Sequence, residues 1–218
     1  MLDGRSSIID LVYSLSLSSY FTQGDAQQRL THLLIMSPSA KEICSKYSAG
    51  SVWLIDATYK TSRYGLPLLY IFGVSATSCT FTFAQCFMQN ENVVDYLWAL
   101  LHLREVFRNY HIQAEINFVT EKEIALMNAL TQTFSNASCL LCRWHISKNI
   151  FAKQRKAFST LDAWEEFVQA WNGLVAATTI VGYESKLASM HVAFPVVSIR
   201  YLDYTWLVYK EKFVSVFL

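Results

Sequence analysis

The chain has 218 residues, of which 53% are hydrophobic and only 16% are charged. This composition excludes an intrinsically disordered chain and predicts a substantial core, in one large domain or in a domain with a flank. The formal net charge is +1, so overall charge neither favours nor excludes binding to nucleic acid, and any basic surface must be local.

Cysteine usage and the start of the chain favour a reducing intracellular compartment. The five cysteines are an odd number at irregular spacing. Asp3, Arg5 and Asp10 interrupt the N-terminal apolar run, so we expect no secretory signal. The longest clean apolar run, Leu66 to Val74, is too short to span a bilayer. The high hydropathy therefore predicts a core, and no membrane partner.

The pattern of apolar residues and breaks predicts the following elements in chain order. We expect a mainly helical flank over 1–50, strands over 51–58, 67–76 and 80–88, a helix over 92–110, a strand over 114–120, a helix over 121–134, a short strand over 138–142, a basic helix from about 144, and helices over 160–217.

This order predicts an α/β fold, because three sequential antiparallel strands followed by βα units form a mixed sheet with flanking helices. The strand order is similar to that of an RNase H-like fold. We expect three parts: the N-terminal flank over 1–50, an RNase H-like core over 51–142, and a helical insertion segment over 143–218.

Two carboxylates follow buried strands of this predicted sheet. Asp56 ends the apolar run Val52 to Ile55, and Glu121 directly follows the strand 114–120. Because the ends of the first and fourth strands lie side by side in such a sheet, both acids could hold divalent metal ions. The alternatives are a strand-end Asp56 that caps a turn, and a Glu121 in the first turn of a helix.

A second candidate metal site is the series Cys139-x2-Cys142-x2-His145. Two thiols and an imidazole could supply part of a zinc site. No further cysteine or histidine pair follows at the spacing of a zinc finger, and buried cysteines on a short strand are the alternative.

A basic stretch is the best candidate for contact with a phosphate backbone. From Ile124 to Leu161 the chain has no Asp or Glu. The basic residues proposed to bind DNA are Arg143, Lys148, Lys153, Arg155 and Lys156. The alternative is an ordinary solvated helix face.

Several ordered motifs resemble the transposase domain of Mutator-like elements (MULE), a family that includes the plant far-red-impaired-response regulators. The resemblance runs from about residue 25 to the end of the chain. The motifs are Leu54-Ile-Asp-Ala-Thr-Tyr-Lys-Thr61 followed by Leu66-Pro-Leu68, Tyr96-x-Trp-Ala-Leu100, Phe118-Val-Thr-Glu-Lys-Glu-Ile-Ala-Leu-Met-Asn-Ala-Leu130, Leu141-Cys-Arg-Trp-His-Ile-Ser-Lys-Asn149, and Tyr201-Leu-x-x-Thr-Trp-Leu-x-Tyr-Lys-Glu-Lys-Phe-Val214.

The resemblance implies a nuclear DNA transposase with three catalytic acids that use Mg²⁺ or Mn²⁺ to cut and join DNA. Asp56 matches the first acid. Glu121 stands where the family has an Asp, and Cys142 with His145 matches a motif that begins a helical insertion. The third acid lies in the family beyond the Lys210–Val214 motif, so we expect a truncated core without its final catalytic helix.

These departures from the family pattern leave three hypotheses. The first is a metal-dependent transposase that uses Asp56 and Glu121. The second is a transposase-derived protein that binds DNA and regulates without cleaving it. The third is a transposon remnant without function. The longer side chain of Glu121 and the missing acid favour a chain that is inactive as a nuclease. Zn²⁺ at the cysteines and a homo-oligomeric state are left open.

Overall fold

The computed structural model describes residues 19–27, 29–36, 38–58, 65–112 and 116–218. The chain divides into two compact units, residues 1–139 and 140–218, which we call the sheet unit and the helical unit and describe separately. The predicted boundary between core and insertion, after residue 142, lies three residues beyond this division.

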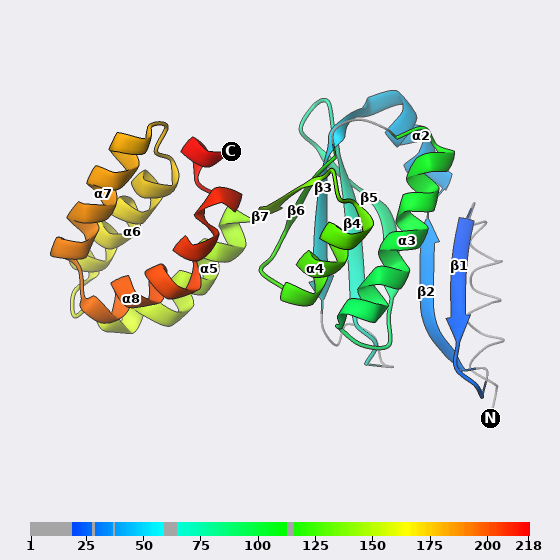
Figure 1. Cartoon of the computed structure of the whole chain (residues 1–218), viewed down its shortest axis with the longest axis horizontal. Coiled ribbons are helices and arrows are strands. Elements are labelled where there is room, and N and C mark those ends of the chain that lie inside the picture. Colours follow the sequence, from blue (N-terminus) through cyan, green and yellow to red (C-terminus); the bar gives the residue numbers. More distant parts are fainter. Residues whose placement is uncertain (1–18, 28, 37, 59–64, 113–115) are drawn as a thin grey trace. The chain divides into compact units, whose positions relative to one another are not determined.

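In the described part of the chain, the sheet has seven strands in the spatial order β1-β2-β5-β4-β3-β6-β7. The strands are β1 (Ser19–Gly24), β2 (Leu30–Met36), β3 (Ser48–Thr58), β4 (Leu68–Ser75), β5 (Thr80–Phe87), β6 (Asn117–Thr120) and β7 (Ser138–Leu141). Strands β3, β4 and β5 pair in antiparallel order, and β6 pairs parallel to β3. This arrangement confirms the predicted mixed α/β, RNase H-like fold (Figure 1).

The N-terminal flank differs from the prediction of a mainly helical segment over 1–50. In its described part, β1 and β2 form an antiparallel hairpin, and β2 also pairs with β5. Only α2 (Pro38–Tyr47) is helical within the described part of this flank. The run Thr31–Leu34 is buried at four successive positions, so side chains on both faces of β2 are shielded from solvent. Residues 1–18 lie outside the described residues.

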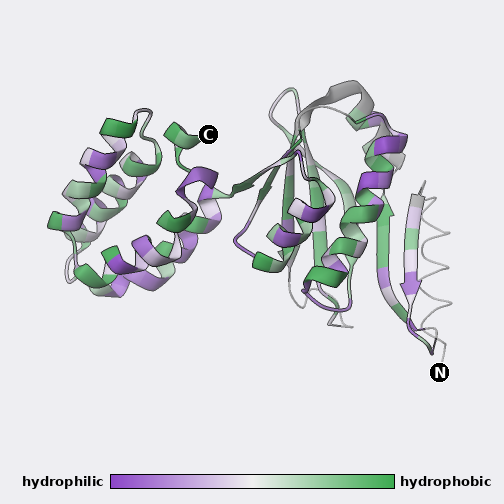
Figure 2. Cartoon of the chain, in the orientation of Figure 1, coloured by the Kyte–Doolittle hydropathy of each residue, from purple (hydrophilic) through white to green (hydrophobic). Residues whose placement is uncertain are grey.

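Helices α3 and α4 of the sheet unit pack against each other on one face of the sheet (Figure 1). Helix α3 (Val93–Asn109) begins where the Asn92 side chain accepts a hydrogen bond from the backbone of Asp95. Helix α4 (Ile124–Thr133) follows β6. The fully buried Trp53 ring contacts Phe83 and Phe107, with ring centroids 4.9 and 4.5 Å away. Green colouring along β3, β4 and β5 in Figure 2 marks this apolar core.

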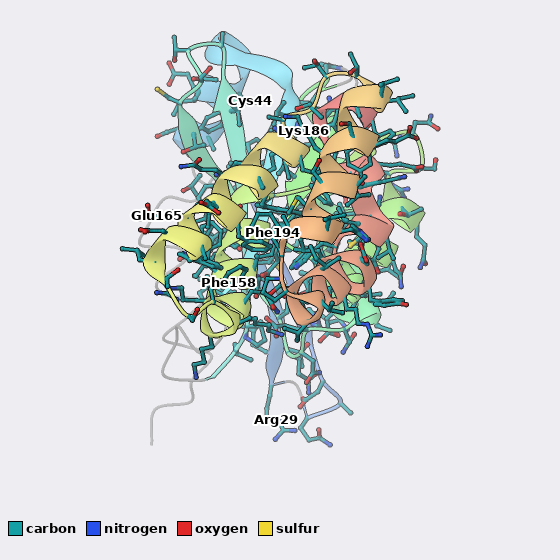
Figure 3. The ribbon with its side chains drawn as sticks, turned by 90° about the vertical axis from the view of Figure 1, so that its left-hand side faces the viewer. Arg29, Cys44, Phe158, Glu165, Lys186 and Phe194 are labelled. Carbon is teal, nitrogen blue, oxygen red and sulfur yellow. The ribbon has the colours of Figure 1, made fainter. Side chains whose placement is uncertain are left out.

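The helical unit contains the helices expected after about residue 144. They are α5 (Arg143–Gln154), the 3-10 turn η1 (Arg155–Ala157), α6 (Leu161–Val175), α7 (Ile180–Ala193), α8 (Val196–Thr205), η2 (Leu207–Lys212) and η3 (Ser215–Phe217). Its core is largely aromatic: Phe158 lies 4.9 Å from Phe167 and 6.4 Å from Phe194 between ring centroids. Figure 3 labels Phe158 and Phe194 within this cluster, and Glu165 on the outer side of α6.

Candidate functional site

Asp56 and Glu121 lie beside each other at the carboxyl ends of two parallel strands. In the register of β3 and β6, Ile55 lies opposite Thr120, so the next residues of both strands are the two acids. A carboxylate oxygen of Asp56 and one of Glu121 lie within 4.8 Å of each other. The sheet therefore brings together the two acids that the sequence proposed as metal ligands.

Burial of the residues before each acid fixes its position. Trp53 and Ile55 are fully buried on β3, and Phe118 and Thr120 are fully buried on β6. Alternation along a strand then places the following acid on the opposite side from the buried residue that precedes it. Both acids are half-buried. A slip of one residue in either strand would expose the core, so the register of the acids is strongly specified.

Glu121 does not lie in the first turn of the helix that follows it. Helix α4 begins at Ile124, and its N-cap is Glu123, whose carboxylate accepts a hydrogen bond from the backbone of Leu126. Glu121 lies in the preceding turn, where its carbonyl accepts a hydrogen bond from the backbone of Glu123 at 3.0 Å. Glu121 therefore precedes the first turn of α4, and metal binding by Glu121 stays a prediction.

Two acids that the sequence did not indicate as site residues, Glu91 and Glu123, follow β5 and β6. Burial raises the pKa of Glu91, and the nearby charge of Glu123 raises it further. Burial also raises the pKa of Tyr96, with contributions from Glu123, Glu91 and Glu121 in decreasing order. The sequence signal for Glu91 was weak, because an acid beside an N-cap residue is common in proteins.

The Asp56–Glu121 pair fits an ion of the Mg²⁺ or Mn²⁺ type. Such ions take carboxylate oxygens at about 2.1 Å, so two ligands of one ion lie up to about 4.2 Å apart. The observed separation of at most 4.8 Å needs only a small side-chain adjustment to reach this value.

The proposed zinc ligands divide between the two units. Cys139 lies on β7 at the end of the sheet unit, whereas Cys142 is the N-cap of α5 in the helical unit. His145 lies in the first turn of α5, with its ring 4.7 Å from that of Trp144. Both cysteines are half-buried, so neither is a fully buried core residue. Zinc binding by Cys139, Cys142 and His145 stays a prediction.

The five basic residues proposed to bind DNA differ in their surroundings. Arg143 donates from Nε to the carbonyl of Phe213 at 2.6 Å and from its guanidinium to Ser215 at 2.9 Å. Arg155 donates to the carbonyl of Phe158 at 3.1 Å. Both arginines therefore hold the helical unit together.

The three lysines of this set are exposed on α5 and η1. The ammonium groups of Lys148 and Lys153 lie over the rings of Trp144 and Tyr201, at 4.8 and 5.8 Å from the centroids. Because their side chains are exposed, these lysines and Lys156 remain accessible to a phosphate.

Asp95 has a structural role in the sheet unit. Its carboxylate lies 3.4 Å from Nε2 of His32 and accepts a hydrogen bond from the backbone of Asn90 at 2.6 Å. His32 is only 4% exposed, and its ring lies 4.9 Å from that of Trp98. This buried pair joins the N-terminal hairpin to α3.

No helix in the described part of the chain is both long and apolar enough to cross a membrane.

Comparison with known proteins identifies relatives over much of the chain. The MULE transposase domain matches residues 52–149. Protein FAR1-RELATED SEQUENCE 5 of Arabidopsis thaliana is 24% identical over 170 residues, which cover 72% of this chain and 21% of that protein. PKS-NRPS hybrid synthetase cheA of Chaetomium globosum is 22% identical over 105 residues, which cover 48% of this chain and 2% of that protein. The matches thus span about a fifth or less of these curated relatives.

Among solved structures, the Mos1 transposase paired-end complex with left transposon end matches with a TM-score of 0.31 and 9% identity, over 96% of this chain and 71% of that chain. Residues 52–149 of this chain are thus similar to the MULE transposase domain, and most of the chain is similar to part of a FAR1-related protein.

Proposed function

We propose that this chain is a MULE-type transposase domain that binds Mg²⁺ or Mn²⁺ between Asp56 and Glu121 and acts on DNA, with strand cleavage weakened by Glu121. The observation that carries the proposal is the approach of the two carboxylates within 4.8 Å at neighbouring strand ends. When bound, such an ion activates water and stabilises charge on a phosphate.

The residues of the chain would contribute orientation and charge. Asp56 on the rigid, buried β3 fixes one ligand, and Glu121 brings a second ligand on a side chain one methylene longer than Asp. A shift of about 1 Å in a reacting group can reduce the rate about 100-fold. Weak cleavage is therefore expected for this chain, and a stronger reaction is expected when the second acid is shortened.

Nicking of supercoiled plasmid DNA in Mn²⁺ tests this function. We expect slow nicking by the wild-type chain, none by Asp56→Asn, and up to about 100-fold faster nicking by Glu121→Asp. Asp162→Asn, which removes a surface acid from α6, is the matched control and should leave the rate unchanged. Equal rates in wild type and Asp56→Asn would overturn the proposal.

The second candidate function is DNA binding without cleavage, as in a transposase-derived regulator. The exposed Lys148, Lys153 and Lys156 on one helix and its extension favour it. Salt-sensitive DNA binding together with no nicking by wild type or by Glu121→Asp would select this function over the first.

A further inference from the structure

Trp144 is the one exposed tryptophan among the six of the chain, all of which lie in its described part. It is 62% exposed, whereas Trp171 and Trp206 of the same unit are 1% and 4% exposed. Trp164 packs against three phenylalanine rings, with centroid distances between 5.4 and 5.6 Å. A large aromatic ring open to solvent is typical of a surface that contacts a partner.

The Trp144 ring lies beside a lysine on the first two turns of α5. Lys148 follows four residues later on the same side of the helix, and its ammonium group lies 4.8 Å from the centroid of the Trp144 ring. The His145 ring meets the Trp144 ring edge-on, with 4.7 Å between centroids. Ala152, one turn beyond Lys148, is small and exposed. This side of α5 therefore presents an aromatic ring and a positive charge together.

The charge around this ring matches a ligand that carries phosphates. The sequence from Ile124 to Leu161 contains no Asp or Glu, and Lys148 is exposed. A nucleotide of single-stranded DNA brings a phosphate for the lysine and a flat base for the ring. In a duplex, neighbouring base pairs cover both faces of each base, so an aromatic side chain cannot stack there without opening the helix. The surface therefore fits unpaired nucleotides best.

We propose that Trp144 stacks on a base of single-stranded DNA while Lys148 contacts a neighbouring phosphate. Stacking on an aromatic side chain tolerates any base, because every base has a flat face, so this contact selects for unpaired DNA and not for a sequence. The proposal rests on the action on DNA proposed above and names unpaired nucleotides as the form that α5 binds.

Fluorescence anisotropy with two labelled oligonucleotides tests the stacking contact in the full chain. One is a single strand of thymines, and the other is an abasic strand of the same length, which keeps the phosphates and lacks the bases. Wild type should bind the thymine strand about 10-fold more tightly than the abasic strand. Trp144→Ala should lose this preference by weakening only the binding of the thymine strand, and Trp144→Phe should keep part of it.

Two matched variants separate stacking from other effects. Tyr204→Ala removes an aromatic ring that is 80% exposed on α8, and it should bind both strands as wild type does. Lys148→Gln should weaken the binding of both strands alike, because it removes a phosphate contact. A preference for the thymine strand that persists in Trp144→Ala would overturn the proposal. An equal loss in Tyr204→Ala would overturn it as well.

Two further measurements separate this proposal from the fold and from the proposed function. Because Trp144 is exposed, Trp144→Ala should unfold at the wild-type midpoint, so that a change in binding is local. Equal binding of the two strands by wild type, together with nicking that depends on Asp56, would overturn the stacking contact and leave the proposed function standing. Preference for the thymine strand through Trp144 without any nicking would support the stacking contact alone.

Discussion

Glu121 is the residue at which this chain departs from the pattern of the family it resembles, and its surroundings explain how the fold accepts it. The turn after β6 is held by backbone hydrogen bonds, and the cap of α4 belongs to Glu123. The Glu121 side chain is therefore not needed for helix formation and can extend toward Asp56. A longer acid at this position changes where its carboxylate lies without changing the strand or helix on either side.

His32 gives the sheet unit a dependence on pH. Burial lowers the pKa of His32 below its ordinary value of 6.5, although the charge of Asp95 opposes the shift. The unfolded chain therefore binds a proton more readily than the folded chain. Above pH 6.5 this contribution to stability is complete, and it is lost as the pH falls through the folded-state pKa.

Urea unfolding at pH 7.5 and 5.5 measures this effect. The free energy of unfolding of wild type should fall between the two values, by at most about 1.4 kcal/mol for each unit between the folded and unfolded pKa. His32→Gln should show a smaller fall, whereas His191→Gln, with a side chain that is 45% exposed, should behave as wild type. An unchanged pH dependence in His32→Gln would refute the role of His32.

At the level of elements, the pairing of β4 with β5 depends on a glycine. Gly73 lies opposite Phe81, and a Cβ atom at Gly73 would lie 2.4 Å from Cζ of that ring. Gly73→Ala should therefore destabilise the sheet unit by about 1–3 kcal/mol, the usual cost of overpacking. Thermal unfolding followed by circular dichroism measures the change.

Gly173→Ala is the control for this experiment, since the added Cβ meets only the Lys186 ammonium, at 3.6 Å. Gly173 lies in α6, so the exchange should stabilise the protein by up to about 1 kcal/mol through helix propensity. A Gly73→Ala variant as stable as wild type would contradict the inference that Phe81 leaves no space for a Cβ atom at position 73.

Arg143 connects the start of α5 to the segment around η3 in the helical unit. Its two hydrogen bonds, to Phe213 and Ser215, join residues 70 and 72 positions apart in sequence. Arg143→Lys keeps the charge but loses the planar fork, and it should destabilise the helical unit by about 1–2 kcal/mol in urea unfolding. Unchanged stability together with weakened DNA binding would mean that Arg143 contributes to DNA binding and not to the stability of the helical unit.

For the whole molecule, the sequence predicted the central elements better than the N-terminal ones. The strands over 51–58, 67–76 and 80–88 were predicted within three residues, because clear turn residues bound each apolar run. Strand β2 was missed because a short continuous apolar run does not distinguish a buried strand from a helix. Pairing with β1 and with the distant β5 makes this segment a strand, and such pairing cannot be seen in the local sequence.

The candidate site shows the same limit. Asp56 and Glu121 could be paired from the strand order alone, since parallel neighbours end at one edge of a sheet. Glu91 and Tyr96 could not, because their nearness to Glu123 depends on how α3 packs beside α4. The structural use of Arg143 depends on a contact across 70 residues of sequence.

DNA binding by the whole chain should depend on salt. Each lysine that contacts a phosphate contributes about 0.9 to the slope of log affinity against log salt concentration. Replacing Lys148, Lys153 and Lys156 together by Gln should therefore reduce the slope by about 2–3 and weaken binding to all sequences alike. A fluorescence anisotropy titration of duplex DNA at several salt concentrations measures the slope.

A matched variant removes the same charge elsewhere in the helical unit. Replacing Lys186, Arg200 and Lys212 by Gln takes three positive charges from α7, α8 and η2. This variant should keep most of the wild-type slope. Equal reductions by the two triple variants would mean that net charge, and no particular surface, drives binding to DNA.

Calorimetric titration of Mn²⁺ into wild type and Asp56→Asn tests most directly whether Asp56 and Glu121 form a divalent metal site. We expect an equivalent of Mn²⁺ in wild type that is weakened at least about 10-fold in Asp56→Asn. Identical Mn²⁺ binding by the two proteins would contradict this expectation, and the chain would then resemble a MULE transposase domain without holding a metal ion at this pair of acids.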